Sequence, residues 1–475
     1  MYDVAIIGGG IVGCAAAERL SQYKVNIAVI DRASDVADGT TKANSGIVHA
    51  GYDAPAGSLM ARLNLEGSRL MEEECSRLDV PLKKTGSFVL AFTPEDEDHL
   101  KLLLKRGKEN GVLGLEILSG DEVRRREPAL SGEVRAALWA PSAAVVDPFQ
   151  LCAAYAEVAA ENGTDFLLEQ EVQRLTWTDD HWVIDTDRGP VEAAYVVNAA
   201  GVHADEIQAM AGKREFAIQP VRGEYYLMDK TLGDLVSSVI FQCPGPLGKG
   251  VLVAPTVHGN LLIGPNAEPV ADRDDTETTL DGQDYVRRTA ARSVPDINYR
   301  EAIRNFAGVR ANSGSGDFII GMSESAPQFL NLAGIGSPGL SSSPAIARMA
   351  VEILRKDGLT LVPRDKAATS RCVVRVRDLP PERRQEVIAE NPLYGRVICR
   401  CETVTEGEIV DAMHSKLVPH TVDGVKKRCG TGMGRCQGGF CQPRILNLLS
   451  RELDLKPEEV RQDNAGSEIL KGELP

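Results

Sequence analysis

Residues 2–32 read YDVAIIGGGIVGCAAAERLSQYKVNIAVIDR, and this stretch decides the fold. The apolar run Val4–Ile7 is typical of a parallel strand that is buried on both faces. Three glycines follow at the G-x-G-x-x-G spacing, Gly8, Gly10 and Gly13, before a helical segment and a second apolar run. The order of strand, tight turn, helix and strand predicts an α/β unit of the dinucleotide-binding type at the start of the chain.

The three glycines have distinct roles in such a turn. The first allows the turn itself, the second lets a pyrophosphate approach the backbone, and the third lets the helix pack closely on the strand. The N-terminus of the helix offers free N–H groups and a partial positive charge to phosphate. Asp31 follows the second strand, where an acidic side chain can bind a ribose hydroxyl. The motif alone does not choose between FAD and NAD.

Three later segments bear on that choice. Residues 38–52 (DGTTKANSGIVHAGY) form a small, polar, glycine-punctuated loop, and residues 195–205 (YVVNAAGVHAD) form a short buried strand that ends in small residues. Residues 329–354 (FLNLAGIGSPGLSSSPAIARMAVEIL) give a strand, another glycine-rich turn and a helix whose N-terminus can face a ligand. Turns dispersed over this length of chain predict one long ligand threaded through a discontinuous domain.

These segments resemble the FAD-dependent oxidoreductases of the D-amino-acid oxidase and glycerol-3-phosphate dehydrogenase superfamily. Within it, KANSGIVHAGYDAPAGSLMARLNLEG and GVLVAPTVHGNLLIGPNAE are similar to the anaerobic glycerol-3-phosphate dehydrogenase catalytic subunits and the L-2-hydroxyglutarate dehydrogenases. The resemblance covers residues 1–365 and implies a mixed α/β and α+β fold. In that fold a discontinuous Rossmann-like FAD domain is interleaved with a mostly antiparallel-sheet substrate domain.

Matching positions imply which residues contact FAD. They are Gly8, Gly10, Gly13, Asp31, Arg32, Thr40, Thr41, Asn44, Ser45, Val172, Ala200, Gly201, Gly336, Ser337, Gly339 and Leu340.

The predicted domain boundaries follow from the same segments. We expect the FAD domain at 1–80, 145–215 and 306–365, the substrate domain at 81–144 and 216–305, a linker at 366–392, a cysteine-rich domain at 393–455 and a tail at 456–475.

The candidate catalytic residues come from both predicted domains. Arg310, in FAGVRANSGSGDF, follows a predicted strand, and arginine is the side chain best suited to bidentate binding of a carboxylate or phosphate. The resemblance places the anion-binding arginine of the family at this position. Arg222 and Lys249 are weaker candidates for the same role.

A histidine has a pKa suited to accepting the proton of a substrate hydroxyl or amine. His49 lies in the loop expected to pass the flavin, and His258, on the predicted hairpin PTVHGNLL, is the alternative.

Five of the ten cysteines lie between Cys399 and Cys441, in VICRCETVTEG and KKRCGTGMGRCQGGFCQPR. Cys399 and Cys401 form a C-x-C pair, which is short for a structural zinc site, and glycines surround the later cysteines. A polar helix is expected between the two groups, with Thr403 to Glu406 resembling its capping box. The spacing alone leaves an iron–sulfur cluster, a zinc site and a thiol redox pair open.

The pattern ICRCE…GMGRCQGGFC is similar to the bacterioferritin-associated-ferredoxin-like domains, which bind a [2Fe–2S] cluster. That resemblance implies the ligands Cys399, Cys401, Cys436 and Cys441, and it leaves Cys429 without a ligand role.

Composition limits the partners. Over 475 residues the 53 Lys and Arg against 68 Asp and Glu leave a formal charge of −15, which argues against nucleic acid and an anionic membrane surface as default partners. The N-terminal segment lacks the basic region of a signal peptide, and no apolar run is long enough to predict a membrane span. We therefore expect a cytoplasmic protein that reaches a membrane only through a partner.

Together, these features predict an FAD-dependent dehydrogenase that oxidises glycerol 3-phosphate or a related 2-hydroxy acid, a small anionic substrate. Electrons are expected to pass from FAD through the [2Fe–2S] cluster to a partner subunit, either a pyridine-nucleotide flavoprotein or a quinone-linked anchor. The alternatives are an L-2-hydroxyglutarate-type dehydrogenase, an amino-acid or opine dehydrogenase, and a non-enzymatic flavin sensor whose C-terminal domain binds zinc.

Overall fold

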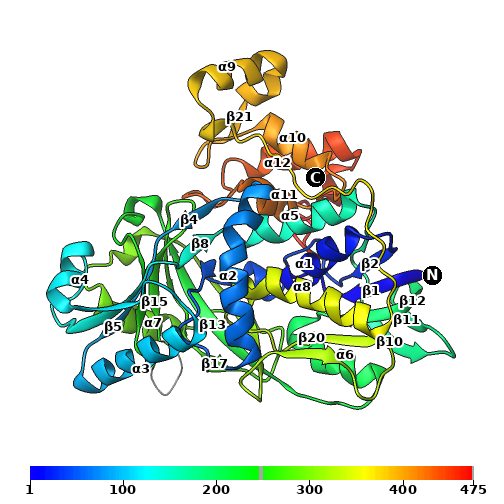
Figure 1. Cartoon of the computed structure of the whole chain (residues 1–475). Coiled ribbons are helices and arrows are strands. Elements are labelled where there is room, and N and C mark those ends of the chain that lie inside the picture. The colour runs from blue at the N-terminus through cyan, green and yellow to red at the C-terminus, as the bar shows by residue number, and fades with distance from the viewer. Residues whose placement is uncertain (245–249, 473–475) are drawn as a thin grey trace.

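Two large sheets and a small C-terminal unit make up the molecule, which we describe from a computed structural model covering residues 1–244 and 250–472 (Figure 1). One sheet is mostly parallel with helices on it, the other is mostly antiparallel, and the C-terminal unit is helical. This arrangement confirms the predicted fold class. Among the residues that the structure describes, no helix is both long and apolar enough to span a bilayer.

The first sheet is built around the N-terminal strand. β1 pairs in parallel with β2 on one side and β12 on the other, and β9 and β20 extend the parallel part. Its strands are β1 (Tyr2–Ile7), β2 (Ile27–Ile30), β9 (Asp165–Leu167), β10 (Val172–Trp177), β11 (Trp182–Thr186), β12 (Gly189–Asn198), β19 (Ile319–Met322) and β20 (Phe329–Ala333). The core side chains of β1 and β2 are fully buried, as their apolar runs predict.

Helices cover this sheet. α1 contacts both α5 and α8, and α2 lies across α8 at the boundary between the two sheets (Figure 1). These helices are α1 (Ile11–Ser21), α2 (Leu59–Arg77), α5 (Pro148–Glu161), α6 (Ala204–Ala211) and α8 (Gly339–Asp357). A three-stranded sheet of β3 (Ile47–Val48), β8 (Ala144–Val146) and β4 (Leu82–Lys84) joins the two halves.

The second sheet carries the substrate-domain segments. Its strands are β5 (Ser87–Ala91), β6 (Glu116–Ser119), β7 (Ala136–Ala140), β13 (Ile218–Met228), β14 (Val239–Gln242), β15 (Leu252–Pro255), β16 (Leu261–Gly264), β17 (Glu268–Pro269) and β18 (Ala302–Ser313). The helices α3 (Pro94–Asn110), α4 (Gly120–Arg126) and α7 (Leu280–Ser293) accompany it.

The long strand β18 pairs with β13 from Ala302 to Ser313. The predicted domain boundary at residue 306 therefore lies inside this strand. The chain returns to the first sheet only at β19, because the backbone hydrogen bonds of β18 are made with β13 along its whole length.

The C-terminal unit contains β21 (Val397–Cys399), β22 (Val404–Thr405), α9 (Pro381–Glu390), α10 (Glu406–Met413), α11 (Val422–Cys429) and α12 (Gln442–Leu453). The predicted capping box at Thr403 to Glu406 is wrong by two residues. Val404 and Thr405 are still paired with β21, so the helix starts later, and Thr405 and Glu408 form the box.

The first part of the predicted linker contacts the first domain. Arg371 pairs with Glu157, and Arg375 donates to Asp79 at 2.9 Å. The segment contains α9, which Figure 1 shows at the top of the molecule, far from the two large sheets.

The C-terminal unit docks on the first domain through a buried ion pair. Arg428 of α11 donates to both carboxylate oxygens of Asp35, at 2.6 and 3.1 Å, and both side chains are 3% exposed. Glu157 of α5 lies 3.3 Å from the same guanidinium. Burial alone raises the pKa of Asp35, but the neighbouring Arg428 outweighs it and lowers that pKa below its ordinary value. Next to this pair, Lys427 donates to Asp38 at 3.2 Å.

We predict that Arg428→Ala lowers the free energy of unfolding by about 3–5 kcal/mol, because it leaves the Asp35 carboxylate buried without its partner. The matched control is Arg451→Ala, which removes a half-exposed arginine from its pairs with Glu406 and Glu452 and is expected to cost at most about 1 kcal/mol. Urea unfolding followed by circular dichroism compares the two. Equal losses in both variants would contradict the role assigned to the buried pair.

Candidate functional site

A cavity of about 1280 Å³ lies between the two large sheets. It begins at the glycine turn after β1, passes the loop 38–45 and ends against β13, β18 and the turn before α8. Its length along the first sheet and its continuation into the second sheet suit an elongated ligand with one end facing a substrate compartment.

The glycine turn leaves no room for side chains. Gly8 has φ +115°, and a Cβ there would lie 2.4 Å from the carbonyl oxygen of Ala199. A Cβ on Gly13 would lie 2.0 Å from the carbonyl oxygen of Gly8. Gly10 precedes α1 and caps it with no side chain, so the N–H groups of the first helical turn, apart from that of Ile11, have no side-chain partner, as a phosphate site requires.

Two polar side chains fix the shape of this turn. Asp31 accepts hydrogen bonds from the N–H groups of Gly9 and Ala33, at 2.6 and 2.8 Å, and Thr41 accepts one from Ile11 at 3.0 Å. Burial raises the pKa of Asp31 above its ordinary value, against the effect of the two donors. The loop 38–45 is thereby tied to the start of α1 across the cavity.

Of the predicted cofactor residues, the structure places all but one along the cavity. Those that line it are Gly8, Gly10, Asp31, Arg32, Thr40, Thr41, Asn44, Ser45, Val172, Ala200, Gly201, Gly336, Ser337, Gly339 and Leu340. Gly13 lies behind the turn, where it allows α1 to pack against Gly8.

The segment that follows β17 spans the outer end of the cavity. Arg273 donates to both oxygens of the buried Asp205, at 2.5 and 3.1 Å, and Asp274 pairs with Arg32. The predicted cofactor residue Arg32 is therefore held by the substrate domain.

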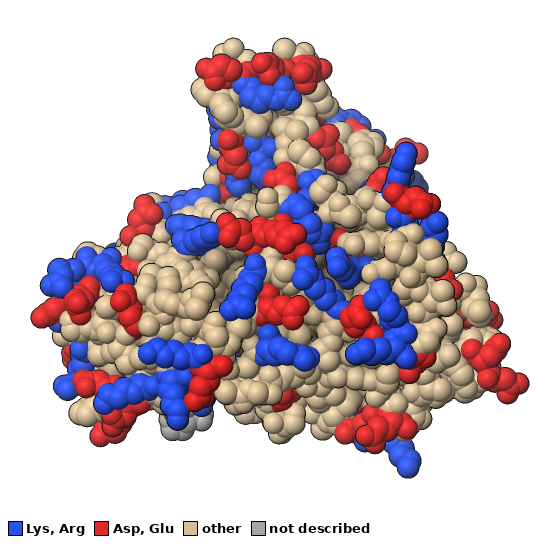
Figure 2. All heavy atoms as spheres, viewed as in Figure 1, with Lys and Arg blue, Asp and Glu red and all other residues tan. Residues whose placement is uncertain are grey.

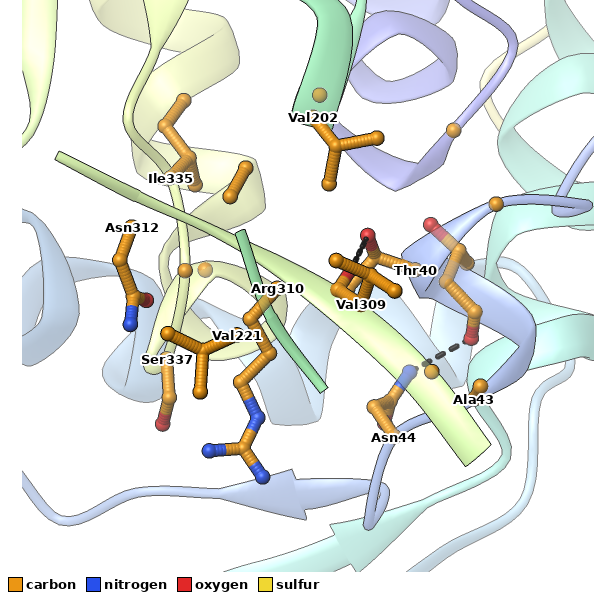
Figure 3. A pocket seen from close by; sticks show the side chains of 18 of the residues that line it. Thr40, Ala43, Asn44, Val202, Val221, Val309, Arg310, Asn312, Ile335 and Ser337 are labelled. Carbon is orange, nitrogen blue, oxygen red and sulfur yellow. Dashed lines mark hydrogen bonds between the residues drawn. The ribbon is translucent and has the colours of Figure 1, made fainter. Parts of the chain in front are cut away.

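Arg310 extends from β18 into the other end of the cavity, between Ser337 and Asn44 (Figure 3). Gly223 on β13 leaves space for the guanidinium, because a Cβ at that position would lie 2.7 Å from Nη2 of Arg310. The Tyr225 hydroxyl accepts a hydrogen bond from it at 3.4 Å. Among the described residues no carboxylate lies within ion-pair distance of Arg310, so its charge is available to an anionic ligand.

His49 lines the same end of the cavity. Its ring stacks on Phe241, with centroids 5.8 Å apart, and Nε2 lies 3.3 Å from the Ser337 hydroxyl. Its backbone N–H donates to Ser341 at 2.8 Å, which fixes the loop on α8. The structure thus brings His49 and Arg310 together with the turn before α8.

His258 is not among the residues that line the cavity. Its Nε2 lies 2.7 Å from Asp147, the N-cap of α5, and its Nδ1 lies 3.3 Å from Arg377 of the linker segment. These contacts connect the second sheet, α5 and the linker segment.

Arg222 does not line the cavity either. It is 4% exposed, and its guanidinium donates to the carboxylates of Asp275 at 2.6 Å and Glu268 at 2.7 Å. Lys249 lies outside the described residues.

Several cavity residues were missed by sequence reasoning. Tyr225 and Phe241 come from strands of the second sheet, and Asn464 comes from the predicted tail. Asn464 accepts a hydrogen bond from the Ser34 N–H at 2.8 Å and donates to Asp38 at 3.0 Å. One sequence signal could have identified Tyr225: side chains alternate along a strand, so Tyr225 shares a face of β13 with Val221 and Gly223.

The C-terminal cysteines meet in two pairs. The Cys399 thiol neighbours Cys441 and the Cys401 thiol neighbours Cys436, and in each pair the neighbour shifts the pKa of the first thiol. Cys399 and Cys441 are 1% exposed, whereas Cys401 reaches the surface. Among the described residues no three His, Cys, Asp or Glu side chains surround one point that a single metal ion could occupy.

Backbone donors surround the inner pair. The hydrogen bond from Cys441 and the N–H groups of Gly432 and Glu402 lower the pKa of Cys399 to about 6, against its burial. A Cβ on Gly434 would lie 2.3 Å from Cβ of Cys401, so the loop closes on the thiols only with glycine there. Two thiol pairs with N–H donors fit a two-iron cluster, in which each iron takes two thiolates.

Cys429 is separate from these four. Its thiol donates to the Glu408 carbonyl at 3.5 Å, and burial raises its pKa to about 12. Its charged neighbours are Glu408 and Arg428 rather than the other cysteines.

Two protein families match the chain. Residues 3–353 match the FAD dependent oxidoreductases, and residues 397–451 match the BFD-like [2Fe-2S] binding domains. The first match contains every residue of the cavity named above except Asn464, and the second contains the four paired cysteines.

Individual proteins are similar over different lengths. A glycerol 3-phosphate dehydrogenase of Caloramator mitchellensis is 45% identical over 99% of this chain and 98% of its own. The L-2-hydroxyglutarate dehydrogenase of Caenorhabditis elegans is 28% identical over 73% of this chain and 92% of its own. The solved L-α-glycerophosphate oxidase of Mycoplasma pneumoniae with FAD bound has a TM-score of 0.75 and 30% identity, covering 79% of this chain and 99% of its own.

We predict that Cys436→Ser loses most of the bound iron and inorganic sulfide, because it removes one member of a thiol pair. Cys429→Ser is the matched control, and it should keep the iron content and visible absorption of the unmodified protein. Iron and sulfide assays on anaerobically purified protein measure both. Iron loss in Cys429→Ser as large as in Cys436→Ser would overturn the assignment of ligands.

Proposed function

The chain belongs to the FAD-dependent oxidoreductases and carries a BFD-like [2Fe-2S] domain, and on that basis we propose that it is a dehydrogenase of glycerol 3-phosphate. The observation that carries the proposal is the shared cavity in which His49, Arg310 and the dinucleotide turn all lie. The similarity to the Caloramator dehydrogenase over nearly the whole of both chains supports the choice of substrate.

Each of the two cavity residues has a task in this reaction. Bound FAD supplies an acceptor for the hydride that leaves the substrate carbon. Arg310 binds the phosphate through its guanidinium, and its position without a carboxylate partner supports this. His49 takes the proton of the hydroxyl as that carbon becomes a carbonyl, and its stacking on Phe241 and its contact with Ser337 keep the ring oriented.

The C-terminal domain favours a dehydrogenase over an oxidase. The match with the Mycoplasma oxidase covers 99% of that protein but only 79% of this chain. Part of this chain therefore has no counterpart in the oxidase. The Caloramator dehydrogenase, in contrast, accounts for 99% of this chain. A cluster domain provides one-electron transfer, which a flavoenzyme that reduces oxygen directly does not need. We propose that an electron-accepting partner protein receives these electrons.

Anaerobic bleaching of the flavin tests the substrate. Glycerol 3-phosphate should bleach the flavin, while glycerol, which lacks the phosphate that Arg310 binds, should not at the same concentration. L-2-hydroxyglutarate and a set of amino acids complete the panel, because relatives act on the former and the arginine accepts carboxylates as well. Bleaching by one of these acids and not by glycerol 3-phosphate would refute the proposed substrate.

We predict that His49→Asn slows flavin reduction by about 10²–10⁴-fold, the range that loss of a general base produces. His258→Asn, which changes a histidine outside the cavity, should alter this rate by no more than about twofold. Anaerobic stopped-flow absorbance measures both rates, and the flavin content of each variant is the control for cofactor loss. A rate within twofold of the unmodified protein for His49→Asn would remove it from the mechanism.

A further inference from the structure

The loop that carries Cys436 and Cys441 has one face against the body of the molecule. Arg435 lies 3.2 Å from Glu301 of the second domain, and Arg304 of β18 donates to Gln437 at 3.4 Å. Glu402, next to Cys401, accepts from Lys230 at 2.8 Å. These contacts occupy the inner side of the thiol site, so a second protein can reach it only from the outer side.

An aromatic side chain stands on the outer side. Phe440 is 80% exposed, although it directly precedes Cys441, which is 1% exposed. Val397, at the start of β21, is 40% exposed, and its carbonyl accepts a hydrogen bond from Arg444 at 3.5 Å. Exposed aromatic side chains of this kind anchor protein interfaces, because their burial by a partner is favourable.

The charge around this position is positive in a chain whose net charge is negative. The segments 396–401 and 435–444 contain four arginines and no Asp or Glu, whereas the whole chain has a formal charge of −15. Arg400 and Arg444 are exposed and form no ion pair with any described residue. The neighbouring acid, Glu402, is 4% exposed and is paired with Lys230 and Arg377.

We infer that the cluster rim, defined as Val397, Arg400, Phe440 and Arg444, is the docking surface for a small acidic redox protein that takes one electron per encounter. Phe440 enters an apolar recess of that partner beside its redox centre, and the two arginines attract its acidic surface. The small area of the rim suits a short-lived complex, as electron-transfer encounters generally are.

The inference rests on the proposed dehydrogenase function, and the electrons and protons of that reaction are all accounted for. Oxidation of one substrate hydroxyl to a carbonyl releases two electrons and two protons, so two molecules of a one-electron acceptor are reduced and the protons go to solvent. No additional reductant is required.

The test uses the complete protein with its cofactors and two haem proteins of opposite charge, acidic cytochrome b5 and basic cytochrome c. The protein is reduced anaerobically, once with glycerol 3-phosphate and once with stoichiometric dithionite, and haem reduction is followed by stopped flow. The dithionite arm separates the two claims, because it measures docking even if glycerol 3-phosphate proves not to be the substrate.

We predict that cytochrome b5 is reduced at least about tenfold faster than cytochrome c at low ionic strength, and that this advantage falls steeply with salt. Phe440→Ala should lower the second-order rate with cytochrome b5 by about tenfold. The double variant Arg400→Glu, Arg444→Glu should lower it by at least about tenfold and raise the rate with cytochrome c.

The matched controls make equivalent substitutions at exposed positions outside the cluster rim. Leu280→Ala removes an 81% exposed apolar side chain on α7, and the double variant Lys101→Glu, Lys105→Glu makes the same change in net charge on α3. Both should keep the unmodified rates. Rates within twofold of the unmodified protein for the rim variants, or equal and salt-independent rates for both cytochromes in the unmodified protein, would overturn the inference. Visible spectra of each variant establish that the cluster is retained.

Discussion

The ion pair between Arg428 and Asp35 is the constraint that places the C-terminal domain on the FAD domain. It is almost completely buried, with both carboxylate oxygens bound by one guanidinium. Asp35 follows β2 by a few residues, in the same loop system as Asp31, whose carboxylate shapes the dinucleotide turn. The iron–sulfur domain is thus seated on the part of the FAD domain that forms the cofactor cavity. Because a buried charge without its partner is costly, the two domains are held in one relative position.

The end of the cavity that holds Arg310 depends in turn on the pairing of β13 with β18. Residues directly opposite in an antiparallel pair share a face, so Val221, Gly223 and Tyr225 point to the same side as Arg310. Gly223 leaves the space that the guanidinium occupies, and Tyr225 supplies a hydroxyl to it. The first domain contributes the loop with His49 to the same space. The proposed anion-binding group and the proposed base therefore come from different domains and meet only in the folded molecule.

Local motifs were the part of the structure that the sequence predicted well. The glycine spacing after β1 identified the turn, and the cysteine pattern with its resemblance identified the four thiols that the structure pairs and the fifth that it sets apart. Features that depend on pairing register were not accessible. Arg222 and Tyr225 lie in one strand, and only the register of β13 on β18 shows which faces the cavity. Likewise, α10 starts later than predicted because β22 is still paired with β21. His258 does not line the cavity because the turn between β15 and β16 brings it to Asp147. Asn464 reaches the cavity through a tail whose path no local pattern indicates.

We propose that substrate oxidation in the cavity and the C-terminal cluster are parts of one electron path. The most direct measurement is an anaerobic titration of the protein with glycerol 3-phosphate, in which flavin absorbance and the electron paramagnetic resonance of the cluster are recorded together. We expect the resonance of a reduced [2Fe–2S] cluster to appear as the flavin is bleached. A fully bleached flavin beside a cluster that stays oxidised, although dithionite reduces it, would contradict a shared electron path.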